Sequence, residues 1–421
     1  MYWLIEDLEQ LKVFYNSSFK EAFVEVIPFN NFEHPTQNNV SAVYVRPIEA
    51  SKGFMLCSNH SETLGIELRH IEEVLKKFNK LYCRDKKELL HYFPLKSLWD
   101  ISLPPNTYIR PTTQTHEIFY NKHKDNREIN IIIPIVKHYE ICERTYNDLQ
   151  VNIGKNTNYD TFFNSKTSLV FNAIERNGIR VHKPTFEKYF HPIDGEFVYS
   201  QYNLKTLTTR PSNRFNGVNY AALNKENGSR KSFIPQNEKF IEIDITAYHP
   251  TISSHLVDFE FPDSDIHSSF ATMYGVDRDK AKELTFKQLY GGVFKEYREL
   301  PFFKRIQSYI NNTWQTFQKE GEIETEISGY KYYRDSLENM NPQKLFNYIL
   351  QNYETSQNIL ILWDILSILR GKKSKLVLYT YDSFLIDLSD SEKDLVKDVQ
   401  KIFENYKLNT KIKYGSSYDF R

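Results

Sequence analysis

Hydrophobic and polar residues follow two different periods along the chain, and these periods predict its strands and helices. Short apolar runs at 39–48 and 53–59 predict strands, whereas apolar spacings of three and four residues at 66–79 predict a helix. A strand followed by a helix is predicted at 80–93. Together these segments indicate a mixed α/β region in the first hundred residues.

The middle of the chain is less regular. The stretch 103–128 contains three prolines and predicts a linker. The apolar spacing of 129–153 predicts a helix that is interrupted near Pro134, and a second helix begins near residue 168 and ends at Gly178. The polar segment 206–232 predicts a loop or a ligand-contacting surface.

The last 180 or so residues alternate strands with long helices. A buried strand followed by a helix is predicted at 240–256, and a short hairpin at 322–333. A long helix at 342–369 precedes a strand–turn–strand at 375–388. A final helix and strand complete an α/β (α+β) pattern.

Composition narrows the picture only slightly. Among 421 residues, 54 Lys and Arg balance 54 Asp and Glu, so any nucleic-acid contact must come from local clusters of charge. Three widely spaced cysteines indicate neither a disulfide framework nor a zinc site. No apolar run reaches membrane-spanning length, and we expect a cytoplasmic protein, in a bacterial host if the source is viral.

Two aspartates stand where apolar strands end. Asp244 follows the strand at 240–243, and Asp382 occupies the turn of the strand–turn–strand. Asp244 is either a helix N-cap or a cation ligand, and Asp382 taken alone is ordinary turn chemistry. Paired on neighbouring strands, the two carboxylates could hold two divalent ions that activate a 3′-hydroxyl and stabilise a leaving pyrophosphate.

Between these aspartates, four side chains recur at every fourth residue. Arg278, Lys282, Phe286 and Tyr290 therefore follow one face of a predicted helix, before Gly291 and Gly292. Cations at its start could bind a triphosphate while the aromatic rings stack on a base. The alternative is a solvated cationic face with two core aromatics.

Asp244, the helix with Arg278, Lys282, Phe286 and Tyr290, and Asp382 resemble the three polymerase motifs of family A (DNA polymerase I-like) DNA polymerases, in the same order. Further segments strengthen the resemblance, over about residues 170–421. They are ERNGIRV at 175–181, TTRPSN at 208–213, DIH at 265–267 and NYILQ at 347–351.

The resemblance implies roles for individual residues. Asp244, Asp382 and the carbonyl of Ile245 would bind two Mg²⁺ ions, with Mn²⁺ as a possible substitute. Nucleotide binding is implied for His267, Arg278, Lys282, Phe286 and Tyr290. Contacts with primer–template DNA are implied for Arg210, Asn347 and Gln351, which would read minor-groove acceptors common to all base pairs.

Some positions depart from the family. Ser383 follows Asp382 where the family carries Glu, and YDSF is closer to single-subunit phage RNA polymerases. The Glu that acts as the family's sugar gate is His249 here, with Tyr248 beside it. Either ring could exclude a ribose 2′-hydroxyl, and the count from Asp244 favours His249.

The resemblance also predicts the domains. A degenerate, inactive 3′–5′ exonuclease-like α/β domain is expected at 1–165, because Asp85 and Glu143, with Tyr139, fall near expected carboxylates but no Asp-x-Glu strand is found. The polymerase domain is expected at 166–421, with palm 195–260 and 342–421 and fingers 261–341. The short separation of ERNGIRV from TTRPSN predicts a missing or reduced thumb, and hence weak processivity.

The sequence therefore predicts a template-directed DNA polymerase that adds dNTPs to a primer, in a reduced form from a bacterial virus or mobile element. A replisome or processivity protein could substitute for the thumb. Two alternatives remain: an RNA polymerase or primase-like enzyme, and a catalytically inactive protein that binds nucleic acid with a polymerase fold.

Overall fold

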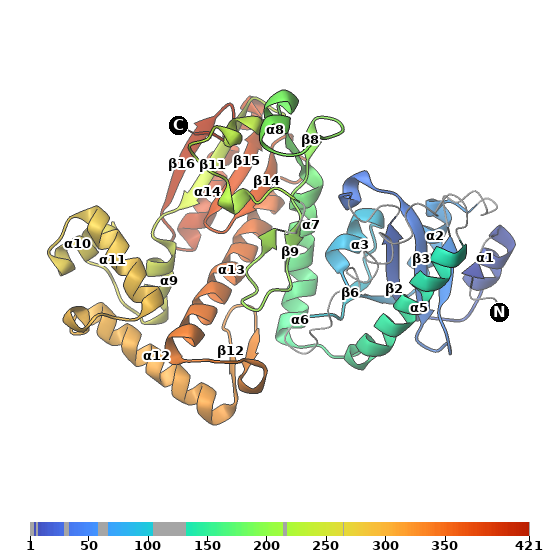
Figure 1. The fold of residues 1–421 in the computed structure, drawn as a ribbon, viewed down its shortest axis with the longest axis horizontal. Helices are drawn as coiled ribbons and strands as arrows, with labels where there is room; N and C mark the ends of the chain where they lie inside the picture. Colours follow the sequence, from blue (N-terminus) through green and yellow to red (C-terminus); the bar gives the residue numbers. More distant parts are fainter. Residues whose placement is uncertain are drawn as a thin grey trace. The chain divides into compact units, whose positions relative to one another are not determined.

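The computed structural model describes residues 4–5, 7–28, 33–57, 66–103, 132–213, 217–263 and 265–420. The chain divides into two compact units, Met1–Asn172 (the N-terminal unit) and Ala173–Arg421 (the C-terminal unit). The predicted mixture of helices and strands is confirmed (Figure 1). Apart from Leu103, the predicted linker at 103–128 lies outside the described residues.

The N-terminal unit is built on one mixed sheet with the strand order β1-β4-β3-β2-β5-β6. Strands β2 and β5 pair in parallel, whereas β2 and β3 pair antiparallel. The elements are β1 (Leu4–Ile5), α1 (Leu8–Tyr15), β2 (Glu21–Pro28), β3 (Val40–Pro47), β4 (Phe54–Cys57), α2 (Leu68–Lys76), β5 (Lys80–Cys83), α3 (Lys86–Tyr92), β6 (Leu98–Asp100), α5 (Ile132–Leu149) and α6 (Asn158–Phe162).

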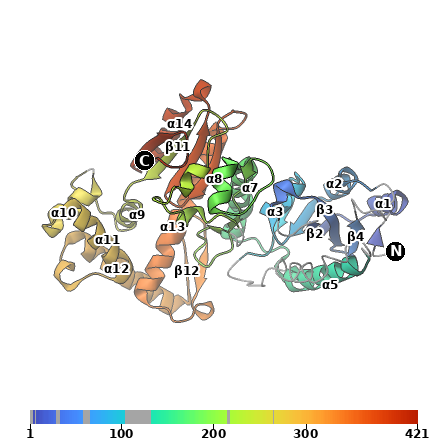
Figure 2. The ribbon, with the colours of Figure 1, turned by 45° about the horizontal axis from the view of Figure 1, so that its top comes forward.

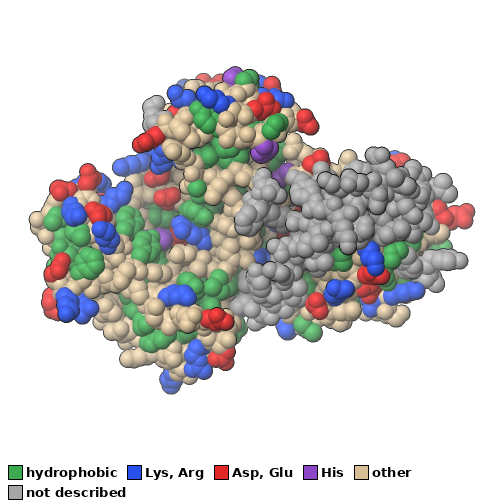
Figure 3. Space-filling view, in the orientation of Figure 1, with side chains coloured by type: hydrophobic (Ala, Val, Ile, Leu, Met, Phe, Trp, Pro, Cys, Tyr) green, Lys and Arg blue, Asp and Glu red, His purple; other side chains and the backbone are tan. Residues whose placement is uncertain are grey.

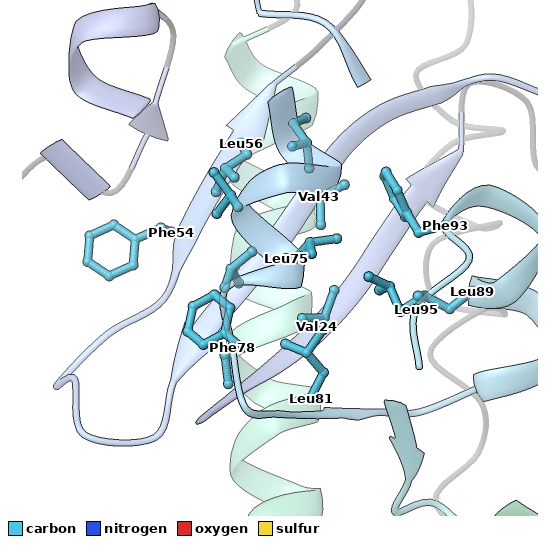
Figure 4. Packing of buried hydrophobic residues seen from close by; sticks show 14 of the residues in the cluster. Val24, Val43, Phe54, Leu56, Leu75, Phe78, Leu81, Leu89, Phe93 and Leu95 are labelled. Carbon is cyan, nitrogen blue, oxygen red and sulfur yellow. The ribbon is translucent and has the colours of Figure 1, made fainter. Parts of the chain in front are cut away.

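Helices cover both faces of this sheet, which explains why its strands are largely apolar. Neighbouring residues of β2 point to opposite faces, so Val24 packs with α2 while Phe23 packs with α5. The first of these two layers contains Val43, Leu75 and Phe78, which converge on Val24 in Figure 4. The sheet is therefore buried between two helical layers.

Sequence periodicity located several elements of this unit but missed others, among them α1, β2 and β6. The predicted strands β3, β4 and β5 and the helices α2 and α3 are confirmed. Strand β2 lies at the centre of the sheet and was not predicted. Its Glu25, which is buried, interrupts the apolar run.

The C-terminal unit contains an antiparallel sheet with the strand order β14-β15-β11-β16. Its elements are α7 (Ser168–Asn177, which starts in the other unit), β7 (Ile179–Arg180), α8 (Lys183–Tyr189), β8 (Phe197–Val198), β9 (Tyr202–Asn203), β10 (Ser212–Asn213), β11 (Lys239–Ile245), α9 (Tyr248–Leu256), α10 (Ile266–Tyr274), α11 (Arg278–Gly291), α12 (Pro301–Glu320), β12 (Glu322–Glu324), β13 (Lys331–Tyr333), α13 (Pro342–Ile368), β14 (Lys375–Thr380), β15 (Ser383–Leu388), α14 (Leu395–Asn405) and β16 (Thr410–Gly415).

Helix α13 organises the helical part of this unit, because α9, α11, α12 and α14 all pack against it. Helices α10 and α11 pack on each other beyond α9, away from the sheet, in both ribbon views (Figures 1 and 2). The predicted helix at 342–369, the hairpin at 322–333 and the strand–turn–strand at 375–388 are confirmed. Gly178 ends α7 with a φ of 64°, as the sequence predicted.

None of the helices in the described part of the chain combines the length and the apolar character needed to cross a membrane.

Candidate active site

Asp244 and Asp382 lie next to each other at one end of the C-terminal sheet. Asp244 is in β11, opposite Ser383 of β15 in the antiparallel register. The amide of Ile245 donates to the carbonyl of Asp382 at 2.8 Å, which joins the two aspartates through the backbone. The N-cap alternative for Asp244 is wrong, because α9 begins at Tyr248 and its N-cap is Ala247.

The turn that carries Asp382 is held in an unusual backbone conformation. Tyr381 has a φ of 61°, which is strained for a residue with a Cβ and persists only where neighbours enforce it. Here the side-chain amide of Asn358 donates to the carbonyl of Tyr381 at 2.7 Å. The guanidinium of Arg210 lies 3.8 Å from the centre of the Tyr381 ring. These contacts fix the position from which the carboxylate of Asp382 projects.

The two carboxylates raise each other's energy when both are ionised. Burial raises the pKa of Asp244 to about 6, with further contributions from Asp382 and Glu242. Asp382 is exposed at the tip of its turn, yet the protein around it still raises its pKa, chiefly by displacing water, and Glu354 adds to the rise. Among the described residues, no lysine or arginine forms an ion pair with either group. Cations farther away, Lys413 for Asp244 and Arg210 for Asp382, offset only part of these effects, so both pKa values stay raised.

A cavity of about 340 Å³ opens beside the end of β11. Two cations from different elements line it, Arg278 at the start of α11 and Lys411 on the edge strand β16. Lys411 stands opposite Asp244 in the register of β11 and β16. The hollowed area between the α10–α11 helices and the sheet, where acidic, basic and histidine side chains gather, is visible in Figure 3. In this structure Arg278 is paired with Asp265, with Nε 2.6 Å from Oδ2.

His267 directly follows two residues that line this cavity, and Phe286 and Tyr290 lie farther along α11, which begins at the cavity with Arg278. Burial and the charges of Arg278 and Lys282 lower the pKa of His267. Its buried Nδ1 has no hydrogen-bond partner among the described residues, so a ligand could use it. Its ring centre is 6.2 Å from that of Phe286, which stacks in parallel with Tyr290. Lys282 is exposed one turn beyond Arg278.

His249 occupies the centre of a polar chain that joins three helices. Its Nε2 lies 3.0 Å from a carboxylate oxygen of Glu354 on α13. Its Nδ1 is hydrogen bonded to the hydroxyl of Tyr290 on α11. The second carboxylate oxygen of Glu354 accepts from the guanidinium of Arg210 at 3.2 Å. The tertiary structure thus brings together three of the residues that the sequence singled out.

Tyr248 points elsewhere. Its ring is buried, and its hydroxyl contacts the side-chain oxygens of Gln357 and Asn358 on α13 at 3.0 and 2.8 Å. The side-chain amide of Asn347 donates to the carbonyl of Tyr290 at 3.2 Å. No hydrogen bond among the described residues joins Gln351, one turn farther along α13, to the other predicted residues.

Three charged residues at the site were not found from the sequence. Glu354 lies among other buried polar residues of α13, and only its contacts with Arg210 and His249 distinguish it. Lys411 becomes relevant only because β16 pairs with β11. Glu242, two residues before Asp244, accepts from the hydroxyl of Ser383 at 3.3 Å and pairs with a lysine of β16. The sequence gave one indication of this role: Glu242 lies two residues before Asp244, so both side chains point to the same face of the strand.

In the N-terminal unit, Glu143, which was expected near an exonuclease carboxylate, and the buried Glu25 are both engaged by other groups. Glu25 of β2 pairs with Arg84, with Oε1 3.0 Å from Nε and both side chains almost buried. Glu143 accepts from the hydroxyl of Tyr44 at 2.8 Å and lies 3.6 Å from Arg46. Each of these carboxylates therefore has a cationic partner within the protein.

The two other predicted residues of that region have ordinary structural surroundings. Asp85 is the N-cap of α3 and accepts from the amide of Glu88 at 3.0 Å. Burial, together with the charge of Glu143, raises the pKa of Tyr139 to about 12.

Comparison with known proteins rests on structure alone, since no family model and no curated protein sequence matches the chain. Among solved structures, it is similar to the POL domain of Pol1 from M. smegmatis, solved in complex with DNA primer-template and dNTP. The TM-score is 0.70 over 98% of this chain and 97% of that chain, with 12% sequence identity. The two chains share a fold. At this identity the likeness concerns the fold, and function must be argued from the site.

Proposed function

We propose that the chain is a template-directed DNA polymerase of reduced family A type, which adds deoxynucleotides to a primer 3′-hydroxyl. The observation that carries this proposal is the placement of Asp244 and Asp382 side by side, next to a cavity lined by Arg278 and Lys411. A POL domain solved with primer-template and dNTP has the same fold, which agrees with the proposal.

The residues suit a pair of divalent cations. Asp244 and Asp382 are neighbouring carboxylates that form no ion pair with a lysine or arginine among the described residues, and hard cations such as Mg²⁺ or Mn²⁺ prefer oxygen ligands. Asp244, Asp382 and the carbonyl of Ile245 would hold the ions. When bound, two such ions would activate the attacking hydroxyl and stabilise the leaving pyrophosphate.

The other residues would bind and orient the substrates. Arg278, Lys282 and Lys411 would bind the triphosphate, where charge-assisted contacts strengthen as negative charge develops. The stacked rings of Phe286 and Tyr290 would support the base pair that forms. Arg210, Asn347 and Gln351 would contact the primer and template in the minor groove, which identifies correct pairing without reading sequence.

Two departures from the family pattern favour a second candidate function. Ser383 donates to Glu242 and the gate position is His249, so two features that the resemblance implies for a DNA polymerase are altered. An RNA polymerase or primase-like enzyme would have the same aspartates with a preference for NTPs. A catalytically inactive protein is disfavoured, because both aspartates and the cations near them are present.

Primer extension tests the proposal. The full chain is incubated with a primed DNA template, Mg²⁺ and either dNTPs or NTPs, and compared with Asp244→Asn and Asp382→Asn. We expect extension with dNTPs that falls at least ~10³-fold in each variant. Extension only with NTPs would favour the second candidate. Activity of either variant within tenfold of the wild type would contradict the two-aspartate assignment.

The N-terminal unit is proposed to be an inactive exonuclease-like domain, supported by the arginines that pair with its carboxylates.

A reduced thumb, and a processivity or replisome protein in its place, follow from the resemblance to family A polymerases. An origin in a bacterial virus or mobile element stays a prediction. The buried free thiols of Cys57, Cys83 and Cys142 agree with the predicted cytoplasmic location.

A further inference from the structure

The buried carboxylate of Glu354 has no role in the functions assigned so far. Its side chain is 2% exposed in the middle of α13, where an ionised group is costly unless it is paired. Both of its oxygens are used, one by Arg210 at 3.2 Å and one by His249 at 3.0 Å. Both partners are residues of the candidate site, so the contacts of Glu354 point to a role in that site.

The contacts of Glu354 reach three parts of the candidate active site. Through Arg210 it reaches the ring of Tyr381, which sets the turn of Asp382. Through His249 it reaches the hydroxyl of Tyr290 on α11. One carboxylate therefore links the loop between β9 and β10, helix α9 and helix α11, which would cover the nucleotide.

The hydrogen bonds also orient the imidazole of His249. A carboxylate accepts, so Nε2 is the nitrogen that donates to Glu354. In a neutral ring, Nδ1 is then left to accept from the hydroxyl of Tyr290. Without the carboxylate, the ring would lose the partner that fixes its rotation, and the hydroxyl of Tyr290 would lose a fixed acceptor.

We propose that Glu354 is a positioning residue for sugar discrimination, which it exerts by holding His249 in one orientation against the sugar of the incoming nucleotide. This inference rests on the proposed function and on His249 as the residue that faces the sugar. Position 249 has an imidazole and no carboxylate, so Glu354 would supply the carboxylate from α13. It would act on the sugar through the side chain of His249.

The test measures the ratio of dNTP to NTP incorporation on one primed template, for the wild type and for Glu354→Gln, which keeps the size of the side chain. We expect the ratio to fall at least ~10-fold, on the scale of one lost specific contact. Asp364→Asn is the matched control: it is the same neutralisation on the same helix, where the carboxylate accepts only from Tyr406 at 3.3 Å among the described residues, and it should leave the ratio unchanged.

A double-mutant comparison separates positioning from general damage. If Glu354 acts through His249, adding Glu354→Gln to His249→Ala should change the ratio no further. Provided that the wild type extends primers, two outcomes would overturn the inference. One is a double variant in which each substitution lowers the ratio by its own independent factor, and the other is an unchanged ratio in Glu354→Gln. A wild type that extends no primer would instead contradict the proposed function itself, and the inference with it.

Tyr290→Phe provides a second test in case Glu354→Gln does not fold. The side chain of Tyr290 is 38% exposed, so its replacement leaves no buried gap. It removes the hydroxyl at the other end of the same chain of hydrogen bonds. We expect a lower ratio that is again not additive with His249→Ala. A ratio equal to that of the wild type would overturn the inference.

Discussion

Asp244→Asn should abolish extension and also stabilise the folded protein in the absence of metal. The substitution keeps the shape of the side chain and removes a charge that burial and the neighbouring Asp382 and Glu242 disfavour. If Asp244 serves catalysis although its charge destabilises the folded state, its replacement should lower the activity and raise the stability together. A residue that merely packs or caps would lose stability when changed.

The size of the gain follows from the shifted pKa. A rise from 3.8 to about 6 corresponds to about 3 kcal/mol of unfavourable free energy for the ionised folded state. Asp244 is half-buried, so water screens part of this cost, and about 1–2 kcal/mol is the expected gain.

The gain must depend on pH in one direction. The unfolded chain loses this proton near pH 3.8, whereas the folded chain keeps it until about pH 6. The folded state therefore binds more protons in this window, and its stability falls as pH rises through it. The advantage of the Asn variant should be absent below about pH 3.8, grow up to about pH 6 and stay constant above.

Urea unfolding in EDTA at pH 4 and pH 8 measures this difference, with Asp148→Asn on the exposed face of α5 as the control. Added Mg²⁺ should then stabilise the wild type and not the Asn variant, since only the folded wild type binds it. An Asn variant that is less stable than the wild type at pH 8, or equally stabilised at pH 4, would refute the reasoning.

Three further outcomes are expected. Lys411→Ala should raise the KM for dNTPs about tenfold through loss of a charge-assisted contact, and Lys397→Ala on the exposed face of α14 should not. Equal steady-state effects of the two substitutions would contradict the cavity assignment. Arg84→Met should lower the free energy of unfolding by about 3–5 kcal/mol, because it leaves Glu25 unpaired, and adding Glu25→Gln should recover most of this loss. Urea unfolding measures both variants, and a double variant as unstable as Arg84→Met would argue against the ion pair. Tyr248→Phe should cost about 1–3 kcal/mol of stability and leave sugar discrimination unchanged, so a collapse of discrimination would make Tyr248 the gate.

Local pattern was sufficient for much of the fold. The strand–turn–strand around Asp382, the long helix α13 and the αL residue Gly178 follow from apolar periodicity and turn chemistry, which act between residues close in the sequence. The same patterns singled out Asp244 and Asp382, because a carboxylate at the end of an apolar strand is unusual. Strand β2 escaped this reasoning, since Glu25 breaks its apolar run and is tolerated only through Arg84.

The sequence by itself determined which residues could carry chemistry, but the tertiary structure decided which of them meet. The count from Asp244 favoured His249 over Tyr248, but nothing in the sequence joined His249 to Tyr290 or gave a reason to choose Glu354 or Lys411. Those roles depend on a partner more than a hundred residues away along the chain and on the register of one edge strand. Burial and pairing create the function of such residues, and both are properties of the packed chain that no local pattern encodes.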